Sequence, residues 1–289
     1  MTGGDVAAPR IPVNGVELAV QVAGSGPPIV LVHGSLDDHR AWERILPRLA
    51  ESHLVVTYDR RGHGDSSCPP GQGRISEDVE DLAGVLGVLG LEAPLVVGHS
   101  YGSSITLLLG ARYPGSTGGL LVHEPPLFAL LRDDASTRHL AEEASEHLRR
   151  AAGLITAGAV AQGVRHFVDH AAFGPGTWDM LFTSEIRRTC LANADTWLDQ
   201  SGDPTRLAVR PELLADYPHP LVVSHGATGL PTYGLIAELI VAALPRSRRR
   251  VLRGAGHAPH LSHPADFAEL VLSCAQETAE RRQDRHRPH

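Results

Sequence analysis

The chain has 289 residues, of which 42% are hydrophobic, and a formal net charge of −7 at pH 7. This length and composition suffice for one large core plus an inserted subdomain. The acidic balance gives no electrostatic reason to expect a nucleic-acid partner. No apolar run resembles a signal peptide or reaches the length of a membrane span, so we expect a cytoplasmic protein without a membrane partner.

The first half of the chain alternates between short apolar runs and amphipathic runs. Asn14-Gly15 predicts the turn of a β-hairpin over 11–22. The alternation that follows predicts an α/β fold with a mostly parallel, twisted sheet and helices on both faces. The predicted strands are 29–33, 54–58, 95–99 and 120–123. The predicted helices are about 38–50, about 76–89, and a third that begins after residue 100 and ends at Tyr113.

The alternation stops at about Leu127, and helical patterns such as 138–155 and 159–173 continue to about Asp216. A strand at 220–224, another at 250–252 and a last helix over about 264–280 then complete the sheet and its cover. We expect 127–216 to be a helical cap over the carboxyl ends of the strands. The predicted divisions are 1–126 and 217–280 for the core, 127–216 for the cap and 281–289 for a disordered tail. The basic run 246–250 is interpreted as a solvated turn.

The most informative segment is Gly98-His99-Ser100-Tyr101-Gly102, which follows the predicted strand at 95–99 and opens the next helix. A G-x-S-x-G sequence between a strand and a helix is the context of a nucleophile elbow, in which the serine sits on a tight, strained turn. Glycines on both sides would let the strand and the helix approach each other. Ser100 is therefore the predicted nucleophile.

A serine hydroxyl needs a base, and His257 is the predicted one. It lies in the glycine-rich segment Gly254-Ala255-Gly256, directly after the strand that ends at Leu252. Loops at the carboxyl ends of strands are where α/β folds place their chemistry. Of the nearby histidines, His260 and His263 come too late in the loop, and His263 precedes Pro264 as a helix cap.

At this point the chain resembles the α/β-hydrolase superfamily. The segment 29–35, with His33-Gly34, is similar to the strand and turn that supply one oxyanion-hole amide, and 59–66 is similar to the D-x-R-G-x-G-x-S loop, which we interpret as structural. The resemblance implies that the backbone N–H groups of Ser35 and Tyr101 form the oxyanion hole.

The superfamily usually carries its acid after the penultimate core strand, but the loop 225–231 contains no carboxylate. Asp216 precedes that strand and would lie at the opposite edge of the sheet. Glu124 follows the strand at 120–123 and precedes Pro125-Pro126, which keep the chain extended. Some members of the superfamily place their acid here, so Glu124 is the predicted third member of the triad.

A closer resemblance connects the chain with zearalenone-type lactonases, through 123–126, 226–229 and 261–267. It implies hydrolysis of an ester or lactone, such as a macrocyclic lactone, with Gly34 and Trp197 as substrate contacts. The cap aromatics could line an apolar pocket, although packing within the cap is the better interpretation for most of them. They are Phe128, Phe167, Phe173, Trp178, Phe182 and Trp197.

The expected mechanism needs no cofactor and no metal, and the expected partner is a small ester or lactone. The three cysteines, at widely spaced positions, show no metal-binding or redox pattern. Two alternatives stay open, because neither the elbow nor the triad separates them from a hydrolase. One is an acyltransferase or cyclase that excludes water, and the other is a ligand receptor with very slow turnover. A homodimer is also open.

Overall fold

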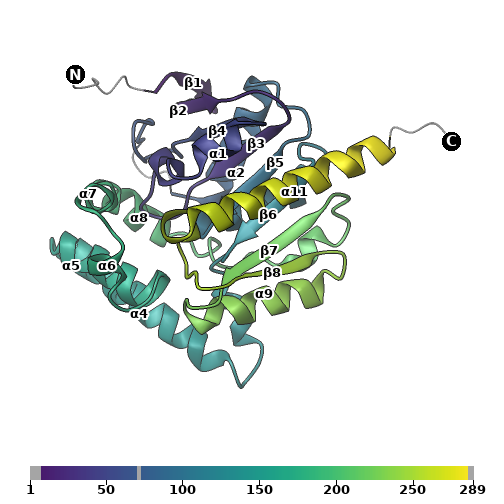
Figure 1. Cartoon of the computed structure of the whole chain (residues 1–289). Coiled ribbons are helices and arrows are strands. Elements are labelled where there is room, and N and C mark those ends of the chain that lie inside the picture. Colours follow the sequence, from purple (N-terminus) through teal and green to yellow (C-terminus); the bar gives the residue numbers. More distant parts are fainter. Residues whose placement is uncertain (1–7, 70–72, 286–289) are drawn as a thin grey trace.

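The computed structural model describes residues 8–69 and 73–285, the last three of these as backbone only. Within this part of the chain, eight strands form one sheet in the order β1-β2-β4-β3-β5-β6-β7-β8 (Figure 1). The first two strands run antiparallel and the others parallel, as predicted. The strands are β1 (Arg10–Val13), β2 (Val16–Ala23), β3 (Pro28–Val32), β4 (Leu54–Tyr58), β5 (Leu95–His99), β6 (Gly119–His123), β7 (Leu221–Gly226) and β8 (Arg248–Leu252).

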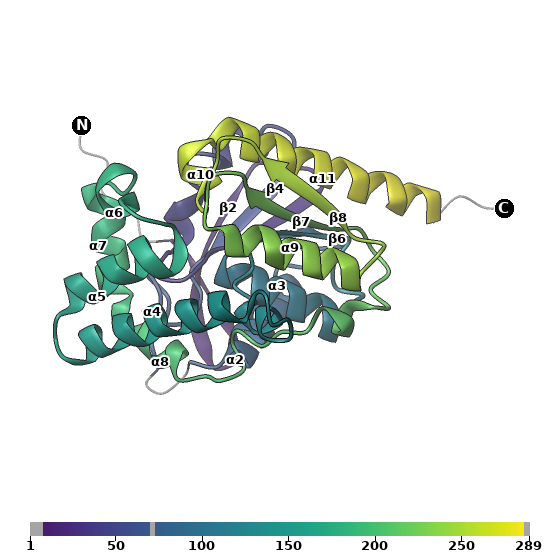
Figure 2. The same cartoon turned by 90° about the horizontal axis from the view of Figure 1, so that it is seen from below.

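Helices cover both faces of the sheet, because alternate strand residues point to opposite sides. Val30 packs in the cluster with α2, α3 and α9, and its neighbour Leu31 packs in the cluster with α1 and α11. Figure 2 shows α11 on one side of the sheet and α9, α3 and α2 on the other. These helices are α1 (Leu46–Ala50), α2 (Ile75–Val88), α3 (Tyr101–Arg112), α9 (Pro231–Ala243) and α11 (Pro264–Arg285), with the short α10 (Pro259–Ser262) before α11.

Residues 127–216, here called the helical insert, connect β6 to β7 and contain no strand among their residues, all of which are described. Their apolar cluster extends to Leu36 and Leu261, which follow β3 and β8, so the insert packs on the carboxyl edge of the sheet. Figure 1 shows it at one end of the molecule. Its helices are α4 (Arg138–Thr156), α5 (Val160–His166), α6 (Thr177–Met180), α7 (Ser184–Ala192) and α8 (Ala194–Ser201), with single turns at Phe128–Arg132, Phe167–Ala172 and Pro211–Leu214.

Two predicted helices differ from the observed ones. The predicted helix over 38–50 is a short turn at His39–Trp42 followed by α1, which has Pro47 in its first turn. Proline lacks an N–H and clashes with the preceding turn, so a helix begins there and does not continue through it. The second predicted helix of the insert, 159–173, is α5 up to His166 and then a wider π turn over Phe167–Ala172.

Only the start of the basic run 246–250 is a solvated turn, with Arg246 exposed in the turn before β8. Arg248 to Arg250 open the edge strand β8 and pair with Val222 to Ser224 in β7. Arg248 forms an ion pair with Glu277 on α11, and Arg249 with Glu238 on α9. Charged side chains on an edge strand discourage pairing with another chain, so this run protects the open edge of the sheet.

The predicted tail, 281–289, is helical where it is described. The helix α11 runs through Arg285, five residues beyond the predicted end, and 286–289 lie outside the described residues.

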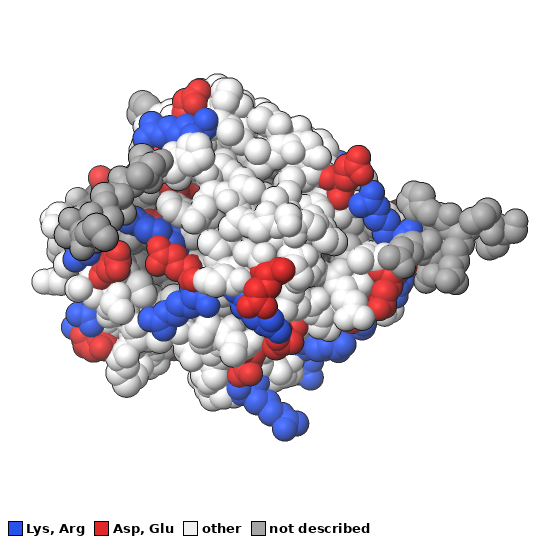
Figure 3. All heavy atoms as spheres, turned by 45° about the horizontal axis from the view of Figure 1, so that its top comes forward, with Lys and Arg blue, Asp and Glu red and all other residues white. Residues whose placement is uncertain are grey.

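Within the described ranges, no helix has the length and hydropathy needed to span a bilayer. Basic and acidic side chains alternate in small groups on the face shown in Figure 3.

Candidate active site

Ser100 occupies a strained turn between β5 and α3. Its φ of 53° and ψ of −122° lie outside the regions that most side chains adopt. A Cβ on Gly98 would lie 2.5 Å from the carbonyl oxygen of Gly102, and one on Gly102 would lie 2.3 Å from that of Val32. The predicted reason for these glycines is therefore confirmed, because a side chain at either position would separate the strand from the helix.

Glu124 and His257 meet directly at the carboxyl edge of the sheet. His257 Nδ1 donates to Glu124 Oε2 over 2.6 Å, and both side chains are fully buried. Glu124 follows β6 with a left-handed φ of 49°, and its other oxygen accepts the N–H of Gly226 over 2.7 Å. The acid that the sequence pointed to is therefore in the position of a residue that orients the histidine.

The loop after β7 carries the triad acid in many related folds. In this chain the loop has no acid, and its backbone contacts Glu124 instead. A Cβ on Gly226 would lie 2.3 Å from the carbonyl oxygen of Ala255. A Cβ on Gly229 would lie 3.5 Å from Glu124 Oε1 and 3.6 Å from the backbone nitrogen of His257. These glycines leave room for a carboxylate that arrives from the neighbouring strand, and the N–H of Gly226 binds it.

Aromatic rings enclose the side chain of His257, and a hydrogen bond holds its backbone. Its ring stacks on Tyr233, with centroids 4.5 Å apart, and meets Phe173 edge-on at 4.6 Å. Its carbonyl oxygen accepts the Nε2–H of His99 over 2.7 Å. Burial lowers the pKa of His257 and so favours the neutral form, which can act as a base. Burial also raises the pKa of Glu124, while His123 and the N–H of Gly226 oppose the rise.

His257 Nε2 is buried and has no hydrogen-bond partner among the described residues. The Ser100–His257 hydrogen bond of a working triad is therefore not formed in this state. Such bonds are often long in free enzymes and shorten when substrate binds. The nitrogen that would take the serine proton is thus unoccupied, and its opposite nitrogen is held by Glu124.

Ser100 lines a small cavity, with a volume of about 20 Å³, between the sheet edge and the helical insert. Ser35 and Tyr101 line the same cavity, so both predicted oxyanion residues lie beside the nucleophile. Tyr101 is the first residue of α3, where backbone N–H groups lack helical partners. This volume holds about one water molecule, so the cavity beside Ser100 is too small for an ester substrate as it stands.

The predicted substrate contacts differ in position. Trp197 is fully buried and lines the cavity with Ser100. Gly34 lies behind the nucleophile instead, since its Cβ would be 3.0 Å from His99 Nδ1 and 3.1 Å from Ser100 Cβ, and it is not a lining residue. Among the other aromatics, Phe128 and Phe167 line the cavity, Phe173 packs on His257, and Trp178 and Phe182 belong to the core of the insert.

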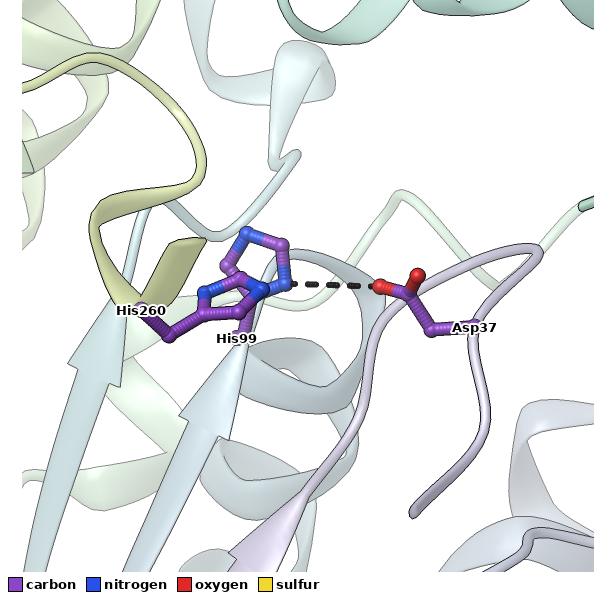
Figure 4. Close-up of side chains that lie close together, drawn as sticks. All are labelled: Asp37, His99 and His260. Atoms are coloured by element: carbon purple, nitrogen blue, oxygen red, sulfur yellow. Dashed lines mark ion pairs between the residues drawn. The ribbon is translucent and has the colours of Figure 1, made fainter. Parts of the chain in front are cut away.

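Two groups of side chains in the described part of the chain bring three ligand-type atoms within 4.8 Å of one another. The first is Asp37, His99 and His260, with both imidazoles turned toward the carboxylate (Figure 4). Because His99 Nε2 donates to a carbonyl, its Nδ1 carries the lone pair, 4.0 Å from Asp37. Burial and the neighbouring Asp38 raise the pKa of Asp37 to about 7, so a protonated carboxyl can also face this lone pair.

The second group is Asp38, His39 and Asp59, and its atoms are already engaged. His39 Nδ1 lies 2.7 Å from Asp59, and Asp38 binds Arg40. The loop 59–66 is structural in the same way, because Asp59 also accepts the N–H of Asp65 over 2.8 Å. The predicted absence of a metal from the reaction stays a prediction.

Two residues beside the nucleophile are not predicted from the sequence. Tyr233 lies on α9, a helix that was not predicted, and both lines the cavity and stacks on His257. Pro231 after an apolar strand was the available signal, since proline is common in the first turn of a helix. Arg206 lies in the irregular segment after α8 and lines the cavity as well. No pattern in the sequence marks it.

A family model described as "Alpha/beta hydrolase family" matches residues 29–270. The chain belongs to the alpha/beta hydrolase family. The predicted fold class and superfamily are therefore confirmed, and the match includes the elbow, Glu124 and the His257 loop.

Individual relatives are more distant. The uncharacterized protein Rv2715 of Mycobacterium tuberculosis is 26% identical over 296 residues, which cover 92% of this chain and 81% of the relative. A 2-(acetamidomethylene)succinate hydrolase of Mesorhizobium japonicum is 30% identical over 105 residues, or 36% and 38% of the two chains. A malate-bound thermophilic esterase from Thermogutta terrifontis has the same fold, with a TM-score of 0.74 and 24% identity. The superposition covers 94% of this chain and 99% of the esterase.

Proposed function

We propose that this hydrolase cleaves a carboxylic ester or lactone through an acyl-enzyme on Ser100. The observation that carries the proposal is the 2.6 Å bond between His257 Nδ1 and Glu124, beside a serine held on a strained turn. A histidine held by a buried carboxylate, with its other nitrogen unoccupied, is the arrangement that activates a serine hydroxyl.

The proposed reaction has two halves. Ser100 Oγ attacks the acyl carbonyl, while His257 Nε2 takes the hydroxyl proton and then gives it to the leaving alkoxide. The N–H groups of Ser35 and Tyr101 would hold the oxyanion, and each such donor is typically worth about 3–4 kcal/mol. A water activated by His257 then attacks the acyl-enzyme and releases the acid. Glu124 stabilises the imidazolium in both halves.

The ester or lactone class is supported by the serine nucleophile. Relatives that open epoxides or remove halogens through a covalent intermediate on this fold use an aspartate at the elbow, and this chain has Ser100 there. A macrocyclic lactone of the zearalenone type is the most specific substrate proposed. It would need the helical insert to move well away from the sheet, because the cavity volume is only about 20 Å³.

The test is a panel of p-nitrophenyl esters and macrocyclic lactones, with the Ser100→Ala variant as control. We expect multiple turnovers with at least one class, and an acyl adduct on Ser100 visible in the intact mass of rapidly quenched enzyme. Turnover by Ser100→Ala at the wild-type rate would refute the assignment.

Two other outcomes would favour the alternative functions. A new ester formed when an alcohol is added would indicate an acyltransferase. One product per protein molecule, followed by negligible turnover, would indicate a ligand receptor.

A further inference from the structure

Arg206 is a buried positive charge in the wall of the active-site cavity. Its exposed fraction is 6%, and it is the one charged residue among the described residues that line the cavity with Ser100. The other lining side chains are mainly apolar, including Phe128, Phe167 and Leu148. A lone guanidinium in such surroundings is costly, because burial removes its hydration.

The guanidinium of Arg206 has no hydrogen bond or ion pair to any side chain or carbonyl in the described part of the chain. It packs over the ring of Trp197, with Cζ 5.6 Å from the ring centroid. This contact fixes the side chain but uses none of its N–H donors. Burial lowers the pKa of Arg206, and nearby Tyr101 and Asp203 only partly oppose the effect.

The charge of Asp203 raises the pKa of Arg206, but other groups already occupy the oxygens of this carboxylate. It accepts the N–H of Ile75 over 2.8 Å, and both the N–H and the hydroxyl of Thr205, over 2.8 and 2.7 Å. Asp203 therefore anchors α2 and its own turn.

The other buried arginines of this fold are paired. Arg60 forms a 3.1 Å ion pair with Asp78 and also binds the carbonyl of Gly34. Arg61 binds Asp81 through two nitrogens, at 2.6 and 2.7 Å. Carboxylates thus pair with the buried guanidinium groups that are structural, and none of the described carboxylates pairs with Arg206.

Two further polar groups beside Arg206 are also unsatisfied. Trp197 Nε1 and the hydroxyl of Tyr101 are buried and have no hydrogen-bond partner within the described residues. Both residues line the cavity. The residues that line the cavity therefore carry two unpartnered donors and a positive charge, and no carboxylate is among the described residues that line it.

We propose that Arg206 binds a carboxylate of the substrate, so that this enzyme acts on esters or lactones that carry a free carboxylate. The inference rests on the proposed ester hydrolysis and names its substrate class. The planar fork of a guanidinium matches a carboxylate in a bidentate geometry. A carboxylate also fits the apolar wall better than a phosphate does, because it is smaller and carries one charge.

The first experiment compares two esters of equal length, the 4-nitrophenyl monoester of adipic acid and 4-nitrophenyl hexanoate. They differ only in a terminal carboxylate or methyl group. We expect the wild type to have the higher kcat/KM for the adipate monoester. Arg206→Gln should lower the ratio of the two kcat/KM values about 10- to 100-fold, which is the effect expected for the loss of a hydrogen bond between charged groups. Arg206→Lys, which keeps the charge but loses the fork, should lie between them.

Arg187→Gln is the matched control. Arg187 also lies in the helical insert and packs over a tryptophan, with Cζ 5.4 Å from the ring of Trp178, but it is not a lining residue of the cavity. This variant should keep the wild-type ratio. A wild type that favours the hexanoate ester, or an Arg206→Gln variant with an unchanged ratio, would overturn the inference while leaving ester hydrolysis intact.

The second experiment separates substrate binding from a structural role. Removing an unpaired buried charge should stabilise the free protein, so Arg206→Met should melt at a higher temperature than the wild type. Adipate should raise the melting temperature of the wild type and not of Arg206→Met, whether or not either ester is hydrolysed. A lower melting temperature for Arg206→Met, or an equal effect of inorganic phosphate and adipate on the wild type, would contradict the proposal.

Discussion

The active-site cavity has two walls that are built differently. The catalytic edge, made of Ser100, Glu124 and His257, stands on short loops at the ends of β5, β6 and β8. Glu124 there accepts two hydrogen bonds, at 2.6 and 2.7 Å, which hold the acid in one position. The insert wall, made of Trp197, Arg206 and their neighbours on the helical insert, carries donors without partners.

This difference separates the chemistry of the enzyme from its selectivity. A site whose polar groups are already paired is preorganised for one reaction. A wall with unpaired donors gains its partners from the ligand, so it can distinguish between substrates. Changes at the catalytic edge should therefore reduce kcat for all substrates, and changes in the insert wall should reduce kcat/KM for some of them.

The largest effect is expected for Glu124→Gln. An amide cannot stabilise the imidazolium, and it lets the ring adopt the wrong tautomer, a change that costs about 10⁴-fold in kcat in a serine protease. We expect a similar loss here, measured with any ester that the wild type hydrolyses, with little change in melting temperature. Asp216→Asn is the control and should keep wild-type activity. Near-normal kcat in Glu124→Gln would mean that another acid, or a Ser–His dyad, does the work.

The second prediction concerns the glycine that supports Glu124. In Gly226→Ala the new Cβ would lie 2.3 Å from the carbonyl oxygen of Ala255, two residues before His257. The loop must move, and displacements of about 1 Å can cost about 10²-fold in rate. We expect a kcat loss of that size.

Gly229→Ala is the matched control, because its nearest contacts would be 3.5 Å or longer. It should retain most of its activity. Equal losses in the two variants would show that the loop tolerates no side chain at all, rather than failing at one point of contact.

The catalytic edge is also the part that sequence predicts best. Backbone contacts require the glycines on both sides of Ser100, and the loop of His257 contains Gly254 with a left-handed φ of 75°, so a local motif encodes the geometry of both turns. Glu124 was predicted because the loop at 225–231 has no acid, and its carboxylate does lie against that loop. Each of these predictions depended on a strand end, where few conformations are available.

The insert wall could not be predicted in the same way. Arg206 reaches the cavity because tertiary packing places it over Trp197, and the irregular segment 202–210 carries no periodicity. The turn at Phe167–Ala172 has π geometry, which a helical pattern over 159–173 does not distinguish from an α-helix. Both features depend on contacts between segments, which a single sequence does not show.

The third prediction tests the insert wall. Ala171 lines the cavity and is 3% exposed, so Ala171→Val should fill part of the remaining space. We expect about a tenfold lower kcat/KM for a hexanoate ester and less than a threefold change for an acetate ester, since overpacking costs about 1–3 kcal/mol. Ala194→Val, in the same apolar cluster but outside the cavity, is the matched control. If the acetate and hexanoate esters are affected equally, Ala171 acts through stability and not through the size of the cavity.

The smallest expected effect concerns the stability of the insert at acidic pH. His147 on α4 lies 3.2 Å from His166 on α5, and His170 stacks on His147 and meets the ring of His166 at a tilt. Burial, His170 and His147 lower the pKa of His166, with a smaller effect of Arg150, while Asp169 raises it. Glu143 approaches His147 to 3.8 Å.

A histidine whose pKa is lower in the folded state than in the unfolded state adds most stability above its unfolded pKa of about 6.5, and that stability falls as the pH drops below this value. The insert should therefore loosen first when the pH is lowered from 7.5 to 5.5. His166 is partly exposed, so solvent screening should limit its effect to a shift of about 1–2 °C in melting temperature.

Tryptophan fluorescence can measure this shift, because Trp178 and Trp197 lie in the insert and only Trp42 lies in the core domain. His166→Asn should melt closer to its pH 7.5 value at pH 5.5 than the wild type does. His170→Asn removes a neighbour that lowers the pKa of His166, so this variant should flatten the dependence in part. A pH dependence that is unchanged in both variants would place the acid-sensitive contact at the catalytic edge, where the buried histidines His99, His123 and His260 lie together.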